Sequence, residues 1–361
     1  MMRAAKYYGK EDVRVEQVPI PQPGPALALV EIEWCGICGS DLHEFITGPV
    51  GIPKPGFPHP LTNETLPIIW GHEFCGTIKS VPPGINLKVG QAVAIDPRLI
   101  CGTCGPCNNH ADHGCHKLGF MGVSGRGGGF SEFVAVEPSM IHPLPKDMPL
   151  EYGAILEPLA VANHAVKMAG NLPWDNSTVL ILGSGPVGIA LILCLKAYGV
   201  RRIIVSEPTM KRRQQVEDIA DTVINPMTDE VEGTCRVTTE GQGVDVVFDC
   251  AGVPQALNQA FRAIKVHGMY VNVAIWEKQF EIPFGDFMWK HITVLPSMAY
   301  NAEDFREVVK MVAEGQLVGY ENIVTARISL EDIASEGLWE LIRNKDQHIK
   351  ILVTPKSHLL H

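Results

Sequence analysis

The sequence predicts an α/β protein of two domains, one rich in β-strands and one built on a parallel sheet. The first third of the chain carries short strand-like runs broken by Pro and Gly, a β-rich signature, together with seven of the ten cysteines. The middle carries apolar strands that alternate with helical segments, as in a doubly wound parallel sheet. A glycine-rich turn joins the first of these strands to its helix.

Composition agrees with a folded, two-domain chain and excludes several classes of partner. The 361 residues suffice for about two domains with full cores, and 46% hydrophobic with 19% charged residues indicates a globular protein. A formal net charge of -10 argues against nucleic acid and offers no basic patch for a membrane surface. The charged N-terminal stretch has no apolar signal core, so we expect a cytoplasmic protein without a membrane span.

The glycine-rich turn predicts a dinucleotide site. It follows an apolar strand over residues 178–182 and precedes a helical run over 189–197. Gly183 allows the sharp turn, Gly185 lets the backbone approach a pyrophosphate, and Gly188 lets the helix pack close to the strand. The helix N-terminus offers free N–H groups to the phosphates. The alternative interpretation is an ordinary glycine-rich turn that binds no nucleotide. The expected cofactor contacts here are Gly183, Gly185, Pro186, Val187 and Gly188.

An acidic residue after the next strand favours NAD over NADP. Glu207 ends the apolar run 202–206 and lies 24 residues after Gly183. A carboxylate there can accept hydrogen bonds from the ribose hydroxyls and repel a 2′-phosphate. The basic residues that follow could hold a phosphate or form a solvated helical turn; they are Lys211, Arg212 and Arg213.

The later strands of the same sheet predict further cofactor contacts, because ligands bind at the carboxyl ends of parallel strands. We place Cys250 and Ala251 near the adenosine, Val273 and Ala274 near the nicotinamide, and Ser297 where the chain crosses back. Residues 161–298 are expected to form this Rossmann-type domain. Residues 1–160 and 299–361 are expected to form the β-rich domain, a twisted and partly closed barrel.

The segment CGICGSDLHEF, residues 35–45, holds the first candidates for chemistry. We interpret Cys38 as a metal ligand and Cys35 as a small buried residue. The alternative is that the two cysteines together form a redox pair or half of a zinc site. Ser40 and His43 can take the proton of a metal-bound alcohol and carry it toward solvent. The alternative is a helix-capping serine with a surface histidine.

Two further segments supply candidate ligands for the same metal. His72 is a suitable zinc ligand, and Glu73 beside it can support or join it, although this pair alone is a weak motif. Glu157 lies in an apolar setting just before a proline, where a carboxylate is costly unless it is paired or binds metal. Glu157 is therefore a candidate third ligand, with a helix-capping glutamate as the alternative.

A run of four cysteines predicts a second, structural metal site. Their spacing is C-x2-C-x2-C-x7-C, and they are Cys101, Cys104, Cys107 and Cys115. Four thiolates close a tetrahedral zinc shell and leave no open position. An iron–sulfur cluster is the alternative, because the first three share a ferredoxin spacing, but the fourth lies further on and no proline follows it.

Together these motifs, in this order, resemble the zinc-dependent medium-chain alcohol and polyol dehydrogenases. The similarity covers nearly the whole chain, and the segments around Glu157 and Glu207, residues 272–276 and the IKILVTP ending look most like fungal (R,R)-2,3-butanediol dehydrogenases. The resemblance implies a GroES-like catalytic domain and a Rossmann domain. It also implies two zinc ions, one catalytic and one structural, with NAD as cofactor.

The resemblance also implies a role for each site residue. Cys38, His72 and Glu157 would bind the catalytic zinc, and Glu73 would lie next to the metal and could exchange with water or with Glu157. Asp41 would orient His72. The proton relay would run from Ser40, which takes the alcohol proton, through the cofactor ribose to His43.

The expected reaction is oxidation of a secondary alcohol, with 2,3-butanediol and acetoin as the substrate pair. Liver-type alcohol dehydrogenases use a cysteine where this chain has Glu157, which favours the polyol branch. Sorbitol, xylitol or L-threonine dehydrogenase is the alternative within the branch. A non-catalytic nucleotide-binding regulator and a structural zinc protein are the alternatives outside it. By resemblance, we expect a homodimer or homotetramer.

Overall fold

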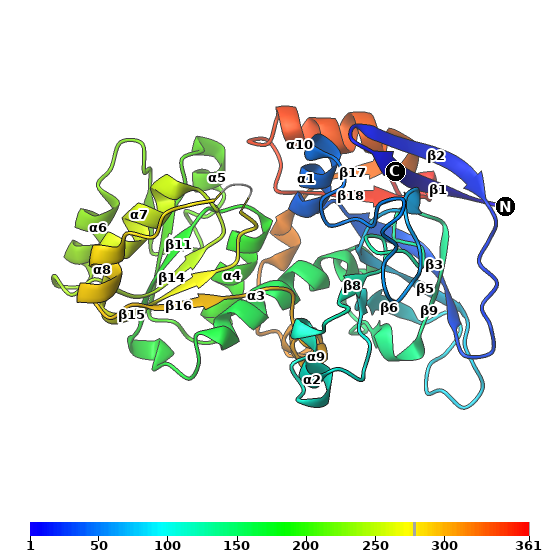
Figure 1. Cartoon of the computed structure of the whole chain (residues 1–361), viewed down its shortest axis with the longest axis horizontal. Coiled ribbons are helices and arrows are strands. Elements are labelled where there is room, and N and C mark those ends of the chain that lie inside the picture. The colour runs from blue at the N-terminus through cyan, green and yellow to red at the C-terminus, as the bar shows by residue number, and fades with distance from the viewer. Residues whose placement is uncertain (277–278, 361) are drawn as a thin grey trace. The chain divides into compact units, whose positions relative to one another are not determined.

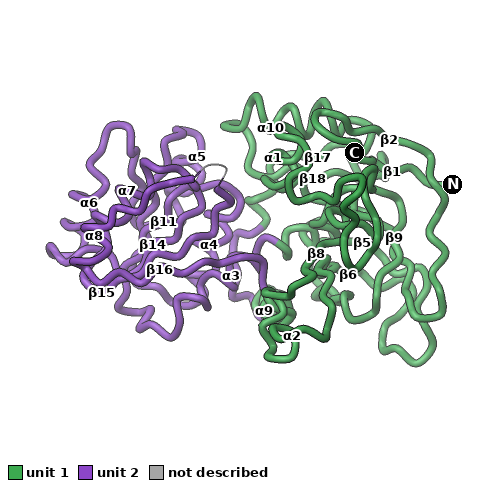
Figure 2. Tube along the Cα trace, viewed as in Figure 1, with its two compact units in different colours: residues 1–157, 301–313, 321–361 green, residues 158–300, 314–320 purple. Residues whose placement is uncertain are grey.

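The chain folds into two compact units (Figure 2). The structure is a computed structural model that describes residues 1–276 and 279–360. Unit 1 comprises residues 1–157, 301–313 and 321–361, and unit 2 comprises residues 158–300 and 314–320. The contacts of the segments 158–160, 299–300 and 314–320, which the sequence analysis assigned to the β-rich domain, place them in unit 2.

Unit 1 is built on largely antiparallel sheets whose strands come from both ends of the chain, with β17 and β18 as a parallel pair. Its main sheet has the order β10-β6-β5-β3-β18-β17, with β9 also paired to β3, and a smaller sheet has the order β2-β1-β4. The strands of unit 1 are β1 (Met2–Gly9), β2 (Asp12–Val18), β3 (Ala28–Gly36), β4 (Ile68–Ile69), β5 (Glu73–Ser80), β6 (Ala92–Ile95), β7 (Arg98–Leu99), β8 (Gly119–Phe120), β9 (Phe133–Val136), β10 (Ile141–Pro143), β17 (Val324–Ser329) and β18 (Lys350–Thr354). The predicted β-rich domain is thus confirmed.

The C-terminal strand fixes the middle of this sheet. In β3, buried and half-buried residues alternate, as expected for a strand with one face on the core. Strand β18 lies between β3 and β17 and, in contrast, is buried along its whole length. Its antiparallel pairing with β3 joins Leu352 to Gly36 and Val353 to Cys35. The end of the chain therefore lies beside the segment that carries Cys38.

Unit 2 is a six-stranded parallel sheet with the order β13-β12-β11-β14-β15-β16 (Figure 1). Its strands are β11 (Thr178–Leu182), β12 (Arg202–Ser206), β13 (Thr222–Ile224), β14 (Val244–Asp249), β15 (Ile264–Asn272) and β16 (Thr293–Pro296). Every adjacent pair is parallel, and the order is the 3-2-1-4-5-6 arrangement of doubly wound dinucleotide-binding folds. The predicted α/β class and Rossmann-type sheet are confirmed.

Helices cover both faces of the parallel sheet, with α4 on one face and α6, α7 and α8 on the other (Figure 1). The helices of the chain are α1 (Gly39–Thr47), α2 (Gly105–Asn108), α3 (Leu156–Met168), α4 (Pro186–Ala197), α5 (Met210–Gln214), α6 (Val231–Thr238), α7 (Pro254–Ala263), α8 (Phe284–Trp289), α9 (Ala302–Ala313) and α10 (Trp339–Arg343). Because α4 is apolar almost throughout, it is buried nearly all round. The strand β11 is likewise fully buried, so the glycine turn between them sits on a rigid base.

Candidate functional site

A thiol, an imidazole and a carboxylate meet in unit 1. Cys38 lies just before α1, His72 just before β5, and Glu73 is the first residue of β5. One ligand atom from each lies within 4.8 Å of the other two. The antiparallel pairing of β3 with β5 places Gly36 opposite Glu73, which brings the segments of Cys38 and His72 together. This set of sulfur, nitrogen and oxygen donors suits zinc.

Asp41 connects two members of this cluster. Its carboxylate is buried and accepts a hydrogen bond from the backbone N–H of Cys38 at 2.9 Å. Its other oxygen lies 3.5 Å from Nδ1 of His72. The pKa of His72 is raised well above its ordinary value: burial lowers it, but the negative charges of Asp41 and Cys38 raise it more. The position of Asp41 agrees with the orienting role that the resemblance implied.

Lys350 is the residue of this site that the sequence analysis missed. Its Nζ lies 2.7 and 2.6 Å from the two carboxylate oxygens of Glu73 and donates a further hydrogen bond to the carbonyl of Ile37 at 3.0 Å. Both charged side chains are 1% exposed. A Cβ added to Gly36 would come within 2.2 Å of Oε2 of Glu73, so only glycine fits there. Glu73 is therefore already paired.

Glu157 lies close to this cluster but is not part of its tightest group. It begins the first turn of α3 and is buried. Its pKa is raised to about 7, chiefly by burial; the charge of Glu73 also raises it, and those of His72 and Lys350 lower it. Among the described residues, the group whose ligand atoms lie within 4.8 Å comprises Cys38, His72 and Glu73 without Glu157.

The remaining predicted residues of this segment lie on or before α1. Ser40 and His43 are half-buried on the first two turns of this helix, five and two residues respectively before Phe45, which is buried in the core. Cys35 is fully buried, and burial raises the pKa of its thiol well above the ordinary value. It therefore behaves as the small buried residue that the sequence analysis expected, whereas Cys38 faces the cluster.

The four-cysteine run forms a compact cluster of sulfur atoms. The Sγ–Sγ distances are 3.5 Å for Cys104 and Cys107, 3.9 Å for Cys104 and Cys115, and 4.0 Å for Cys101 and Cys107. Zn–S bonds of about 2.3 Å would separate the sulfurs of a tetrahedron by about 3.8 Å. None of these cysteines is in a disulfide bond. Backbone N–H groups lower the pKa of Cys101 to about 5, which favours the thiolate that binds metal.

Buried ion pairs of Arg98 connect the cysteine lobe, residues 101–115, to the rest of unit 1. Arg98 on β7 donates to both carboxylate oxygens of Asp96, at 3.0 and 2.7 Å, and to Asp112 at 3.1 Å. Asp112 begins the short 3₁₀ segment Asp112–Gly114 that leads to Cys115. His113 in that segment lies 2.7 Å from Oδ1 of Asn301. The lobe is thus tied to the strand before it and to the start of α9.

The glycine turn of unit 2 has the conformation that its sequence predicted. Gly183 has φ +89°, in the left-handed region that favours glycine, and a Cβ on Gly188 would lie 2.0 Å from the carbonyl oxygen of Gly183. Helix α4 begins at Pro186, directly after Gly185. The first N–H groups of this helix have no acceptor within the helix, as anion binding at the turn requires.

Glu207 holds the glycine turn from the next strand. Its Oε2 accepts a hydrogen bond from the backbone N–H of Ser184 at 2.8 Å, and its Oε1 accepts one from the N–H of Thr209 at 2.9 Å. The side chain is 3% exposed. Arg212 on α5 reaches the same turn, because a Cβ on Gly185 would lie 3.9 Å from its Nη1. Glu207 and Arg212, which bear on the choice between NAD and NADP, thus both border the glycine turn.

The other predicted cofactor residues follow β14, β15 and β16 at the same edge of the sheet. Cys250 and Ala251 follow β14, Val273 and Ala274 follow β15, and Ser297 follows β16. Parallel strands end at one edge, so these loops and the glycine turn after β11 share that edge.

Comparison with known proteins identifies the family. Residues 24–146 match the model of the alcohol dehydrogenase GroES-like domain, and residues 186–314 match that of the zinc-binding dehydrogenases. The chain is 39% identical to (R,R)-butanediol dehydrogenase of Bacillus subtilis, over 98% of this chain and 100% of that protein. The (R,R)-butanediol dehydrogenase of Saccharomyces cerevisiae is 33% identical, over 99% of each chain. The chain belongs to the zinc-dependent medium-chain alcohol dehydrogenases.

A solved structure of this dehydrogenase family supports the assignment. The crystal structure of 2R,3R-butanediol dehydrogenase from Bacillus subtilis superposes with a TM-score of 0.91 at 38% identity, over 99% of this chain and 100% of that chain. The resemblance to the butanediol branch is thus confirmed, and it extends to bacterial as well as fungal members. Among the described residues, no helix of this dehydrogenase has the length and apolar character needed to cross a membrane.

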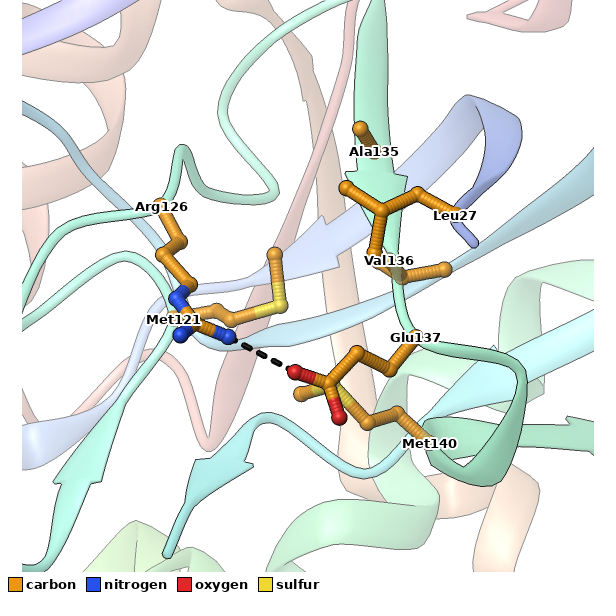
Figure 3. A pocket seen from close by; sticks show the side chains of 7 residues that line it. All are labelled: Leu27, Met121, Arg126, Ala135, Val136, Glu137 and Met140. Atoms are coloured by element: carbon orange, nitrogen blue, oxygen red, sulfur yellow. Dashed lines mark hydrogen bonds and ion pairs between the residues drawn. The ribbon is translucent and has the colours of Figure 1, made fainter. Parts of the chain in front are cut away.

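A separate cavity of about 430 Å³ lies in unit 1 of the dehydrogenase (Figure 3). Its apolar wall includes Met121 and Met140, and an ion pair of 2.8 Å between Arg126 and Glu137 crosses its rim. None of the residues that line it is a predicted ligand or relay residue. The residues expected to carry the chemistry of this family therefore lie at the cluster of Cys38, His72 and Glu73 and not in this cavity.

Proposed function

We propose that this enzyme oxidises (R,R)-2,3-butanediol to acetoin with NAD⁺ as hydride acceptor. The observation that carries this proposal is the similarity to (R,R)-butanediol dehydrogenases over almost the entire chain. The cluster of Cys38, His72 and Glu73, with Glu157 close to it, supports the proposal, because these side chains include the thiol, imidazole and carboxylate donors that such chemistry needs.

Cys38, His72 and Glu157 are the proposed ligands of the catalytic zinc. When bound, zinc supplies Lewis-acid chemistry that lowers the pKa of the alcohol hydroxyl. The donor set fits this ion, since it combines a thiol, an imidazole and a carboxylate in a buried setting. Asp41 would fix the tautomer and orientation of His72. Glu73 would remain beside the metal, because Lys350 already neutralises it.

The proton of the alcohol leaves through side chains of α1 in this proposal. Ser40 would accept the hydroxyl proton, and His43, one turn further along the helix, would pass it to solvent. The vicinal second hydroxyl of a diol would provide a further oxygen near the polar cluster. These roles remain proposals for Ser40 and His43.

NAD⁺ would lie along the carboxyl edge of the sheet in unit 2, where it supplies C4 as the hydride acceptor. The N–H groups at the start of α4 would hold its pyrophosphate. Glu207 is positioned beside the glycine turn, where its carboxylate disfavours a 2′-phosphate, while Arg212 borders the same turn. We therefore propose NAD rather than NADP as the cofactor.

The cluster of Cys101, Cys104, Cys107 and Cys115 would hold the structural zinc. Its sulfur spacing and the lowered pKa of Cys101 support this assignment. A two-site account expects about two zinc ions per chain by metal analysis. A single zinc, or iron in the cysteine site, would overturn it.

A homodimer formed by the outer strand of unit 2 is the proposed assembly. Strand β16 is the edge of the parallel sheet and is largely exposed. Large apolar side chains are exposed on and next to it, and they include Met288, Trp289, Val294 and Met298. An uncovered apolar sheet edge invites pairing with a second copy. Two such dimers could form a tetramer.

The deciding experiment is NAD⁺ reduction followed by absorbance. Each stereoisomer of 2,3-butanediol is assayed beside sorbitol, xylitol, L-threonine and ethanol, with Cys38→Ser as the inactive control. We expect the highest kcat/KM with the (R,R) diol. Preference for a longer polyol or for threonine would keep the reaction class and reject this substrate. No turnover with any alcohol would reject the proposed function.

A further inference from the structure

A buried carboxylate stands where the cofactor loops meet. Asp249 is the last residue of β14, and its side chain is fully buried. Its Oδ1 accepts hydrogen bonds from the backbone N–H groups of Ala251 at 2.8 Å and Gly252 at 2.9 Å. Its Oδ2 accepts the hydroxyl of Tyr270 on β15 at 2.6 Å. Three donors therefore converge on one side chain, and an ionised carboxylate can accept from all three.

The backbone of the same residue holds a second loop. The carbonyl oxygen of Asp249 accepts the N–H groups of Val273 and Ala274, both at 2.9 Å. These two residues follow β15, the strand that also carries Tyr270. The loop after β14 and the loop after β15 are thus both bonded to Asp249.

Contacts with the glycine turn extend this arrangement to a third loop. The N–H of Cys250 donates to the carbonyl of Leu182 at 3.0 Å. A Cβ on Gly183 would lie 3.5 Å from both the Cβ and the N of Ala251. The backbone of residues 250–251 therefore packs directly against the turn that begins the dinucleotide motif.

A second polar residue continues the connection to the edge strand. The side-chain amide of Asn272 donates to the carbonyl of Ala274 at 2.9 Å, and its oxygen accepts the indole N–H of Trp276 at 2.8 Å. The backbone carbonyl of Asn272 accepts the N–H of Ser297 at 2.8 Å. The loop at the end of β15 is thus held from both sides, with Asp249 on one and Asn272 on the other.

Burial of this carboxylate has no structural necessity at the end of a strand, where an apolar residue would cost less. Burial raises the pKa of Asp249, while the bonds from Tyr270 and the two N–H groups lower it. The loops it organises need backbone that can approach a cofactor, so they lack large side chains that could hold them by packing. Hydrogen bonds to one central acceptor can hold them instead.

We propose that Asp249 is a positioning residue that sets the shape of the adenosine and nicotinamide loops, 250–252 and 273–274, with Tyr270 as its support. This inference rests on the proposed function, since it assumes that NAD lies at this edge of the sheet. Asp249 acts on the cofactor through the loops and not by contact.

The test measures NADH affinity by fluorescence titration of the full-length protein. Asp249→Ala leaves two N–H donors and a hydroxyl without their acceptor, and we expect the Kd for NADH to rise about tenfold or more. Tyr270→Phe removes a single hydroxyl and keeps the ring, so we expect a rise of about threefold. Asp249→Asn keeps an acceptor for both N–H groups and should bind nearly as well as the unsubstituted protein.

Val246→Ala is the matched control. Val246 is fully buried in the same strand, so its truncation lowers stability without touching the loops. We expect it to leave the Kd for NADH unchanged, and we expect the KM for the alcohol at saturating NAD⁺ to stay unchanged in Tyr270→Phe. The proposal is overturned if Asp249→Ala and Val246→Ala have the same Kd for NADH at matched thermal midpoints. If Asp249→Ala does not fold, an unchanged Kd for NADH in Tyr270→Phe overturns it instead.

Failure of the two hypotheses can be distinguished. An unsubstituted protein that binds no NADH refutes the proposed function and this inference together. A protein that binds NADH, turns over no alcohol and loses affinity in Asp249→Ala refutes the function and supports the inference.

Discussion

At the scale of single residues, the cluster of Cys38, His72 and Glu73 depends on a buried cation. Glu73 and Glu157 bring two buried carboxyl groups together in unit 1, and Lys350 is a buried lysine that contacts Glu73. A buried charge is tolerated when a partner of opposite sign and hydrogen bonds accompany it. Lys350 meets this requirement for Glu73, and it reaches the site only because β18 inserts next to β3.

Replacing Lys350 alone should destabilise the protein far more than replacing Lys350 and Glu73 together. In Lys350→Met, Glu73 remains buried without a counter-charge, and we expect a loss of about 3–5 kcal/mol in the free energy of unfolding. The double variant Lys350→Met, Glu73→Gln removes both charges and should recover most of that loss. Guanidinium unfolding of both variants measures the difference. Equal losses in the single and double variants would show that the pair is not coupled.

A second residue-scale feature is a buried neutral histidine away from the metal cluster. His142 on β10 is 9% exposed and packs against Phe305 on α9, with ring centroids 4.6 Å apart. Burial lowers its pKa to about 4; the charge of Asp96 opposes the shift, and those of Arg306 and Arg98 add to it. The unfolded chain binds a proton here near pH 6.5, whereas the folded chain does not.

The contribution of His142 to stability should therefore be lost in acid. It is fully present above about pH 6.5 and declines as the pH falls toward 4, by about 3 kcal/mol at most. His142→Phe keeps a ring against Phe305 and removes the titration, so its thermal midpoint should fall less between pH 6.5 and 4. Parallel pH profiles for the two proteins would contradict this assignment.

At the scale of elements, the turn between β11 and α4 depends on glycine at two positions for different reasons. Gly183 adopts a left-handed φ, whereas Gly188 has no room for a Cβ beside the carbonyl of Gly183. The separation of 2.0 Å is far below any van der Waals contact, so a side chain would push the helix away from the strand. The position of the helix N-terminus relative to the strand follows from this contact.

Gly188→Ala should therefore weaken NADH binding at least about tenfold, because the N–H groups of α4 would move from the phosphate position. Gly233→Ala is the control, since its Cβ would meet Glu230 at an ordinary 3.5 Å within α6. We expect that variant to bind NADH normally and to gain about 0.5–1 kcal/mol in stability. Fluorescence titration and thermal unfolding give both results; equal binding by the two variants would reject the steric argument.

At the scale of the whole molecule, assembly is proposed to depend on the exposed edge of unit 2. Val294 lies in β16 and is 37% exposed, so a glutamate at this position would place a charge in the proposed interface. We expect Val294→Glu to sediment as a smaller species than the unsubstituted protein. Val237→Glu, at an 84% exposed position on α6, should leave the sedimentation unchanged. A monomeric unsubstituted protein would exclude the dimer.

Much of the fold could be read from local patterns. The strands 178–182 and 202–206 were predicted with the bounds that the structure has, because each is a short apolar run bounded by turn residues. The segment that leads into α3, in contrast, begins as a 3₁₀ helix, Leu150–Ile155. Helix ends depend on capping and packing, which periodicity alone does not report.

The candidate site likewise has a part that local sequence patterns predict and a part that they do not. The sequence by itself determined the family and the glycine turn, and it supplied the proposed ligands Cys38, His72 and the four-cysteine run, because these are local motifs whose spacing carries their meaning. Only the tertiary structure decided which distant charges complete them. Lys350 lies 277 positions from Glu73, and Asp249 joins the loops that follow β14 and β15. Such partners are set by strand pairing, and the pairing of remote strands leaves no local pattern in the chain.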